Sequence, residues 1–315
     1  MTPTLLRPGA AMLLGLVAAG CGSAPEPQYD PAIEAEFLER RRAIEEEKGR
    51  QSFEGDLIKI DQAIDKYASA WLTTELSSSD RLREKLEQYL RGMVDRHLPR
   101  LLATADRRDL PAQRAISLAA LGFSGRQEAL DTLLNGARDD DPLIATAALF
   151  GLAVLHEPNT PPGVLGEIMT DAKKPVDVRR NASLALVKLQ EHTFKPEAIE
   201  PYWEAVLAKP LDSEDSGIQV HALRGLGLRR NPAYAHYAEK FASHPHAMVR
   251  SAAAIAMGRM KNTSSVPTLL GLLGPAETND NVRLAARKAL QELAGGIDRY
   301  YDVAAWRKVF ERGGD

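Results

Sequence analysis

Few residues of this chain have the types and spacing that catalysis or metal binding requires. His236, His244 and His246 lie close in sequence, but no carboxylate or cysteine at ligand spacing joins them, so we expect exposed histidines in a turn between helices. Asp212 opens an acidic stretch like a calcium loop, yet the twelfth position, where such a loop needs glutamate, is Leu223. No nucleophile motif, phosphate-binding glycine loop or zinc-spaced cysteine set occurs. The sequence therefore predicts no catalytic residue, no metal and no cofactor.

The elements that would position any site are copies of one helix, repeated between residues 96 and 295. The six copies, here called signature helices, begin at Gln113, Ile144, Val178, Ile218, Val249 and Val282, and successive starts lie 31, 34, 40, 31 and 33 residues apart. Such a period is typical of a solenoid, because one unit of this size cannot bury its apolar face alone. A more variable first helix is expected before each copy, at Leu98–Ala105, Glu128–Ala137, Val164–Ala172, Pro196–Ala208, Pro232–Ala242 and Val266–Leu273.

The signature helices share a pattern of small and apolar residues. Counted from the first residue as position zero, small residues recur at positions four and seven and larger apolar residues at position eight, which places all of them on one helix face. This Val-Arg-x-x-Ala-x-x-Ala-Leu pattern is similar to HEAT repeats, in the short bacterial form also found in phycobilin-lyase-like proteins. The resemblance implies an all-α fold, a right-handed α-α superhelix of about six helical repeats with an N-terminal helical cap.

In the HEAT-repeat family, an arginine at position one commonly joins a ladder with aspartates of neighbouring repeats. The residues that match are Arg114, Arg179, Arg250 and Arg283, whereas Ala145 and Gln219 depart from the pattern. The resemblance therefore implies a ladder that is interrupted at the second and fourth repeats.

A further HEAT-like family, the deoxyhypusine hydroxylases, binds iron through several His-Glu pairs. This chain has one such pair, His156-Glu157. We therefore expect no iron site of that kind.

The segments on either side of the repeats are expected to be helical caps. Residues 30–95 are predicted to hold a charged, loosely attached helix from Asp30 to Lys48, a helix with an apolar stripe from Leu57 to Trp71, a break at Ser77–Asp80, and a helix from Leu82 towards the first repeat. In residues 296–315, Trp306 and Phe310 lie one helical turn apart and could cover the last repeat.

The only cysteine, Cys21, follows an apolar run at Ala10–Ala19 that is too short to span a bilayer. The sequence Leu16–Cys21 resembles the lipobox of bacterial lipoproteins, which implies a signal peptide at residues 1–20, acylation of Cys21 and a tether at residues 21–29. Gly22 fits the pattern of lipoproteins sent to the outer membrane of Gram-negative bacteria, which implies the periplasmic face of that membrane. The alternative is an ordinary signal peptide with a spare thiol.

Composition excludes some classes of function. The chain has 315 residues, 44% of them hydrophobic and 26% charged, and a formal net charge of −3. This is the composition of a globular protein with an apolar core, and it lacks the basic excess of nucleic-acid-binding proteins.

We expect the functional residues at positions six and ten, where the residue types differ among the six copies. Position six carries Ala119, Phe150, Leu184, Arg224, Ile255 and Lys288, and position ten carries Phe123, Val154, Lys188, Leu228, Arg259 and Glu292. If these positions line the groove of the solenoid, it is apolar towards the early repeats and basic towards the late ones, and it suits an amphipathic or acidic segment. The candidate partner-binding residues are Phe150, Lys188, Arg224, Arg259 and Lys288. Packing between repeats is the favoured interpretation for Phe150, Leu184 and Ile255.

Three functions remain open at this stage. The first is a membrane-anchored, non-enzymatic scaffold or adaptor that binds another envelope protein. The second is a periplasmic module that binds small ligands or acts as a chaperone. The third, which rests on family resemblance alone, is a lyase-like or metal-dependent enzyme.

Overall fold

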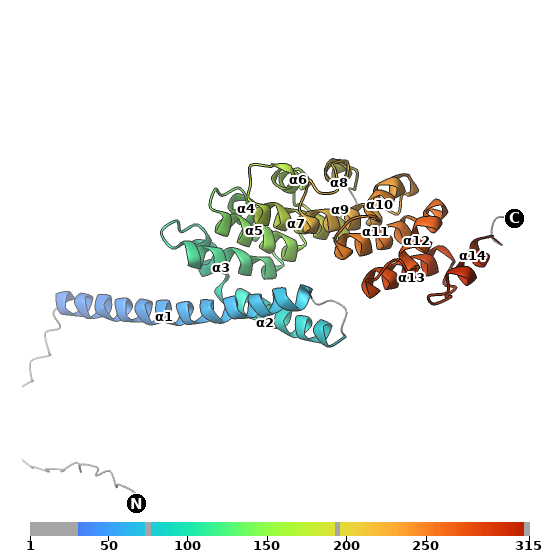
Figure 1. Cartoon of the computed structure of the whole chain (residues 1–315). Helices are drawn as coiled ribbons and strands as arrows, with labels where there is room; N and C mark the ends of the chain where they lie inside the picture. The colour runs from blue at the N-terminus through green and yellow to red at the C-terminus, as the bar shows by residue number, and fades with distance from the viewer. Residues whose placement is uncertain (1–30, 73–76, 193–195, 312–315) are drawn as a thin grey trace, which may run out of the picture. The chain divides into compact units, whose positions relative to one another are not determined.

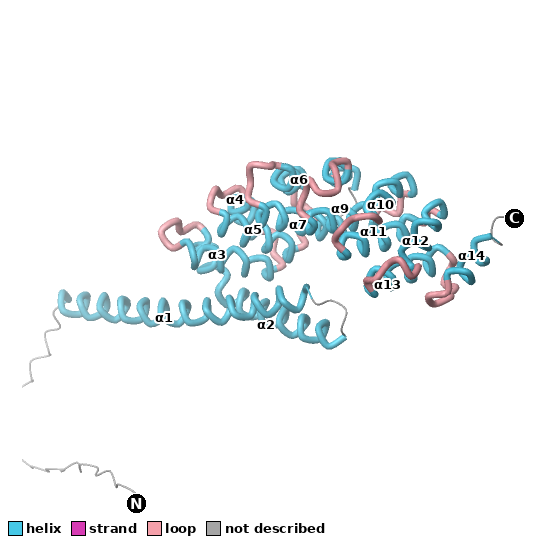
Figure 2. The backbone as a smooth tube through the Cα atoms, in the orientation of Figure 1, coloured by secondary structure: helices cyan, strands magenta, loops and turns pink. Residues whose placement is uncertain are grey.

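The computed structural model describes residues 31–72, 77–192 and 196–311, and every regular element within them is helical. This confirms the predicted α-solenoid (Figures 1 and 2). The chain divides into two compact units, residues 1–52 and residues 53–315, and the second unit holds all the repeats. Cys21 and the tether lie outside the described residues.

Fourteen α-helices occur in the described ranges, and most of them follow the predicted pairs. Two helices precede the repeats, α1 (Pro31–Leu72) and α2 (Ser77–Ala105). The signature helices are α3 (Pro111–Leu121), α5 (Pro142–Leu155), α7 (Val176–His192), α9 (Ser216–Leu228), α11 (Ala247–Met260) and α13 (Asp280–Leu293). The remaining helices are α4 (Glu128–Ala137), α6 (Pro162–Thr170), α8 (Glu200–Leu207), α10 (Ala235–Phe241), α12 (Val266–Leu273) and α14 (Val303–Glu311).

The boundaries differ from the predictions in a few places. The predicted break at Ser77–Asp80 is wrong, because these residues form the first turn of α2, where serine and aspartate suit a helix N-terminus. The two helices expected from Asp30 to Trp71 are one continuous helix, α1. Two of the predicted first helices, at Pro196–Ala208 and Pro232–Ala242, begin as a separate 3-10 turn before α8 and α10.

The signature helices form one continuous row. Each packs directly on the next, in the order α3, α5, α7, α9, α11, α13, whereas α4, α6, α8, α10 and α12 pack mainly on their own signature helix and little on one another. Helices that lie closer together belong to the shorter, inner side of a curved stack. The signature helices therefore form the inner side of the repeats.

Small residues explain how the helices of this row approach one another. Positions four and seven are fully or almost fully buried in all six copies, as predicted. Gly151 is at position seven of α5, and a Cβ atom added there would lie 2.6 Å from the carbonyl oxygen of Leu118 on α3. No larger residue fits at that helix crossing without moving the backbone.

The end of the repeats is covered by α14, which packs against α12. Trp306 is fully buried, and its Nε1 donates a hydrogen bond of 2.9 Å to the carbonyl oxygen of Tyr300. Its ring stacks on Phe310 with 6.3 Å between ring centroids.

Among the described residues, none of the helices combines the length and the apolar composition that crossing a bilayer would need.

Candidate protein-binding surface

Three of the four arginines at position one of the signature helices tie their own repeat to the next one. In the first repeat, Arg114 donates from Nε to the carbonyl oxygen of Ala105, at the end of α2, over 2.9 Å. Its Nη1 pairs over 2.8 Å with Asp139, in the turn before the next signature helix. The same arrangement recurs twice with glutamate as the acid, and the three ion pairs are Arg114–Asp139, Arg179–Glu214 and Arg250–Glu277. Each of these three pairs joins two repeats, as the family resemblance implied. The fourth matching arginine, Arg283, lies 3.8 Å from Asp280 of its own helix and forms no ion pair with another repeat among the described residues.

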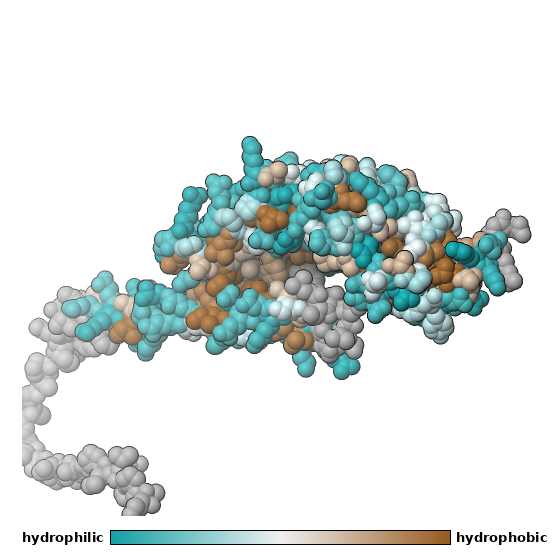
Figure 3. Space-filling model, viewed as in Figure 1, coloured by the Kyte–Doolittle hydropathy of each residue, from teal (hydrophilic) through white to brown (hydrophobic). Residues whose placement is uncertain are grey.

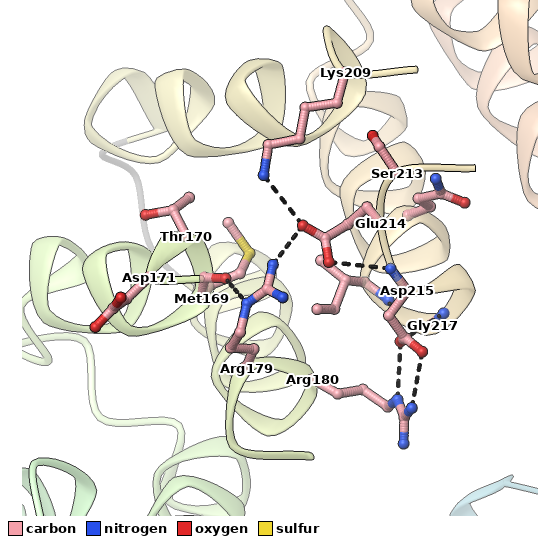
Figure 4. A network of polar contacts seen from close by, with 12 residues as sticks. Met169, Thr170, Asp171, Arg179, Arg180, Lys209, Ser213, Glu214, Asp215 and Gly217 are labelled. Atoms are coloured by element: carbon pink, nitrogen blue, oxygen red, sulfur yellow. Dashed lines mark hydrogen bonds and ion pairs between the residues drawn. The ribbon is translucent and has the colours of Figure 1, made fainter. Parts of the chain in front are cut away.

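Two residues of the acidic stretch that begins at Asp212, Glu214 and Asp215, contact arginines of α7 (Figure 4). Glu214 pairs with Arg179 and accepts a hydrogen bond of 3.2 Å from Lys209. Burial opposes the charge of Glu214, but the backbone N–H of Asp215 and these two cations outweigh burial, so the pKa of Glu214 is lowered. Asp215 accepts two hydrogen bonds from Arg180, of 3.0 and 2.8 Å. Both carboxylates are thus held by arginines.

In the fourth repeat, an uncharged residue, Gln219, takes the place of the ladder arginine. Gln219 is fully buried and donates a hydrogen bond of 2.7 Å to the carbonyl oxygen of Leu211. His244 shares this carbonyl oxygen over 3.0 Å from Nε2, and its Nδ1 accepts from the backbone N–H of His246 over 3.0 Å. His244 is only 2% exposed, so the prediction that it is an exposed turn residue is wrong. Both of its ring nitrogens are used in packing the turn.

Arg250→Gln is expected to lower the free energy of unfolding by about 2–3 kcal/mol at neutral pH, because it leaves a largely buried carboxylate, Glu277, without its cation. Arg250 lowers the pKa of Glu277 below the ordinary 4.5, although burial opposes this. The contribution of the pair is therefore present above pH 4.5 and is lost as the pH falls through the lowered pKa of the folded state. Urea unfolding at several pH values measures the contribution of the ion pair to the free energy of unfolding, and Arg307→Gln is the control. An equal difference between Arg250→Gln and wild type at pH 7 and pH 3 would contradict the assignment.

Four cations lie at positions six and ten of the late signature helices, and we call them the inner-face cations: Lys188, Arg224, Arg259 and Lys288. Lys188, on α7, donates 2.9 Å from Nζ to Glu191, and Arg224, on α9, pairs with the same carboxylate. Burial would raise the pKa of Glu191, but Lys188 and Arg224 together lower it. Glu191 therefore neutralises much of the charge at this end of the row.

Arg259, on α11, has no such partner. Its side chain is half-buried, yet it forms no hydrogen bond or ion pair with any described residue. Its Cδ lies over α9, 3.7 Å from where a Cβ atom on Gly227 would stand. Burial lowers the pKa of Arg259, and the charge of Arg224 lowers it further. Lys288, on α13, is exposed and also forms no ion pair within the described ranges.

The early end of the row is already covered. Phe150, on α5, is half-buried, and its ring lies 6.4 Å from that of Phe123. Phe123 in turn contacts Tyr67 of α1 edge-on, with 5.0 Å between centroids, and both are buried. Figure 3 shows hydrophobic residues gathered beside the first repeats, and α2 packs on α3. The apolar part of the expected groove is thus largely filled by the chain itself.

Ile255 does not pack between repeats as expected. Its side chain is 42% exposed, although it occupies the same position six as Phe150 and Leu184, which pack against the core. Ile255 lies one helical turn before Arg259 on α11. An exposed aliphatic side chain therefore stands next to the unpaired arginine.

The single His-Glu pair, His156-Glu157, lies at the C-terminal end of α5. His156 ends α5 with a left-handed backbone (φ 53°), and its ring lies 4.4 Å from that of His192. Burial and the charge of His192 lower the pKa of His156 to about 4. Glu157 accepts hydrogen bonds from Asn159, and among the described residues no three His, Cys, Asp or Glu side chains are grouped to hold a metal ion.

Comparison with known families places HEAT repeats at residues 204–291. This stretch runs from α8 into α13 and contains Arg224, Arg259 and Lys288. The chain contains HEAT-like repeats. Among curated proteins, none is significantly similar in sequence to this chain.

The chain is also similar to several solved structures. A designed armadillo repeat protein is 18% identical and aligns with 62% of this chain and 99% of its own, with a TM-score of 0.46. The complex of CpcE and CpcF of phycocyanin lyase from Nostoc sp. PCC7120 is 18% identical over 68% of this chain and 87% of its own (TM-score 0.47). Human deoxyhypusine hydroxylase in complex with glycerol is 15% identical over 82% and 97% (TM-score 0.30). All three TM-scores lie below 0.5, so these similarities say nothing about activity.

Proposed function

We propose that this HEAT-like repeat protein is a non-enzymatic scaffold or adaptor that binds another protein through the inner face of α7, α9, α11 and α13. Repeat solenoids offer long, continuous surfaces of this kind to protein partners. The observation that carries the proposal is Arg259, a half-buried cation without a carboxylate partner among the described residues.

An unpaired, half-buried arginine is costly to the protein that holds it. Partial removal of a cation from water is unfavourable unless an anion or several hydrogen bonds compensate for it. The ladder arginines of the same repeats have such compensation, as Arg250 has from Glu277. Arg259 can therefore bind a hydrogen-bond acceptor of another protein. Arginine is among the residues that contribute most to the binding energy of protein interfaces.

The proposed partner belongs to the cell envelope, because the lipobox-like sequence that ends at Cys21 supports a lipid anchor on the periplasmic face of the outer membrane. Cys21→Ser is expected to move the protein from the membrane fraction to the soluble fraction after cell lysis. Fractionation of cells that express the full chain measures this. Unchanged retention of the serine variant in membranes would contradict the anchor.

Site-specific photocrosslinking tests the proposed binding surface. A photoreactive phenylalanine analogue at Ile255 is expected to crosslink a discrete envelope protein in living cells. The same analogue at Gly271, which is exposed on α12 and has nothing within 4 Å of its added Cβ, serves as control. Absence of a crosslink at Ile255, or the same product from both positions, would contradict the proposal.

A further inference from the structure

We infer that the inner face recognises a short amphipathic segment of a partner protein, with one or two carboxylates close to an aliphatic side chain, and does not recognise a polyanion. This inference rests on the proposed function and specifies the chemistry of the partner. It follows from three features of the row: one uncompensated arginine, carboxylates on both sides of it, and an exposed aliphatic residue beside it.

The charges of the row favour few negative charges in the partner. Arg259 and Lys288 form no ion pair among the described residues, whereas Lys188 and Arg224 are both engaged by Glu191. A partner carboxylate can pair with a guanidinium through two parallel hydrogen bonds. Two free cations can therefore accommodate one or two carboxylates.

The neighbouring acids oppose a longer run of negative charge. Glu191 lies on α7, on one side of Arg259, and its charge acts on that arginine. Glu292 lies on α13, on the other side, where it is exposed and also acts on Arg259. A nucleic acid, or an unbroken acidic run laid along the row, would place its charges against these carboxylates, and like charges at an interface are unfavourable.

The aliphatic preference follows from Ile255. Residues four apart on a helix are neighbours on its surface, so the exposed side chain of Ile255 and the stem of Arg259 form one small apolar area that ends in a positive charge. A partner covers this area best when it carries an aliphatic side chain about one helical turn from its carboxylate. Apolar contact alone would leave Arg259 without an anion.

Selection of short random peptides displayed on phage tests this inference, with the full chain as target. The expected consensus has one or two Asp or Glu residues within four positions of Leu, Ile, Val or Met. Arg259→Gln is expected to abolish its enrichment, and Arg307→Gln, which removes an exposed cation on α14, to leave it unchanged. Circular dichroism of both variants checks that they fold.

Four outcomes would overturn the inference: no enriched acidic-aliphatic consensus, a consensus without carboxylates, a preference for unbroken acidic runs, and equal enrichment on Arg259→Gln. These results are separate from the test of the proposed function. A protein crosslinked at Ile255 whose binding segment lacks carboxylates would refute this inference and leave the adaptor function standing.

Discussion

Trp203→Ala is expected to lower the free energy of unfolding by about 3–5 kcal/mol, the usual cost of deleting a large buried aromatic side chain. Trp203, on α8, is fully buried. Its Nε1 donates a hydrogen bond of 2.7 Å to the side-chain oxygen of Gln190 on α7, and the amide of Gln190 donates one of 2.9 Å to the carbonyl oxygen of Gly225 on α9. The substitution therefore removes apolar contacts and leaves a buried oxygen unpaired.

Two glycine substitutions check the same contact with the tryptophan in place. A Cβ on Gly225 would lie 2.4 Å from Nε1 of Trp203, so Gly225→Ala is expected to cost about 1–3 kcal/mol through overpacking. Gly271→Ala meets nothing within 4 Å and is expected to stabilise α12 by about 0.5–1 kcal/mol.

Urea unfolding followed by circular dichroism measures all three variants. Amide hydrogen exchange in α7–α9 shows whether these repeats open before the others, because repeat stacks lose stability locally. Equal stability of Gly225→Ala and Gly271→Ala would mean that Trp203 does not lie against Gly225.

Reversing the charge of Arg224, Arg259 and Lys288 together, to glutamate, is expected to weaken partner binding by roughly 100-fold or more. Arg259 loses its role as the uncompensated cation, and two flanking positions become repulsive towards a partner carboxylate. Arg224→Glu also places a second carboxylate beside Glu191, which adds to the repulsion. Because Arg224→Glu also removes one of the two cations that hold Glu191, circular dichroism and urea unfolding check that the variant folds before its binding is measured.

The sequence predicted the repeats well because their signal is local and repeated. The residues at positions four, seven and eight need only one helix and its neighbour to be interpreted, and their burial follows the prediction in every copy. The helix boundaries were harder to predict in α1, which continues through Gly49 and Gly55 between the two predicted helices, because a glycine inside a helix lowers its stability without necessarily ending it.

The candidate site depended on which residues meet across helices, and one sequence cannot give that register. Glu191 was missed, although it holds both Lys188 and Arg224, because its pairing with Arg224 needs the offset between α7 and α9. Arg259 was chosen because a cation is difficult to bury unpaired, but its lack of a partner among the described residues could be known only from the structure.

His244 was misjudged for a related reason. A histidine next to proline in a turn is usually exposed. In this turn, however, His244 is buried because it shares the carbonyl oxygen of Leu211 with Gln219, which replaces the ladder arginine. The signal was present in the sequence, since position one of that repeat lacks its arginine. A missing ladder residue indicates that another polar group must satisfy the buried carbonyl oxygen.

The most direct test is the dissociation constant of the protein crosslinked at Ile255, measured with the wild-type chain and with the Arg224, Arg259 and Lys288 to glutamate variant. A matched control reverses three exposed cations away from the inner face, Lys173, Lys261 and Arg307. An inner-face binding site predicts a loss of roughly 100-fold in the first variant and little change in the control. Equal affinities of the two variants for the partner would contradict the assignment of the inner face as the binding surface.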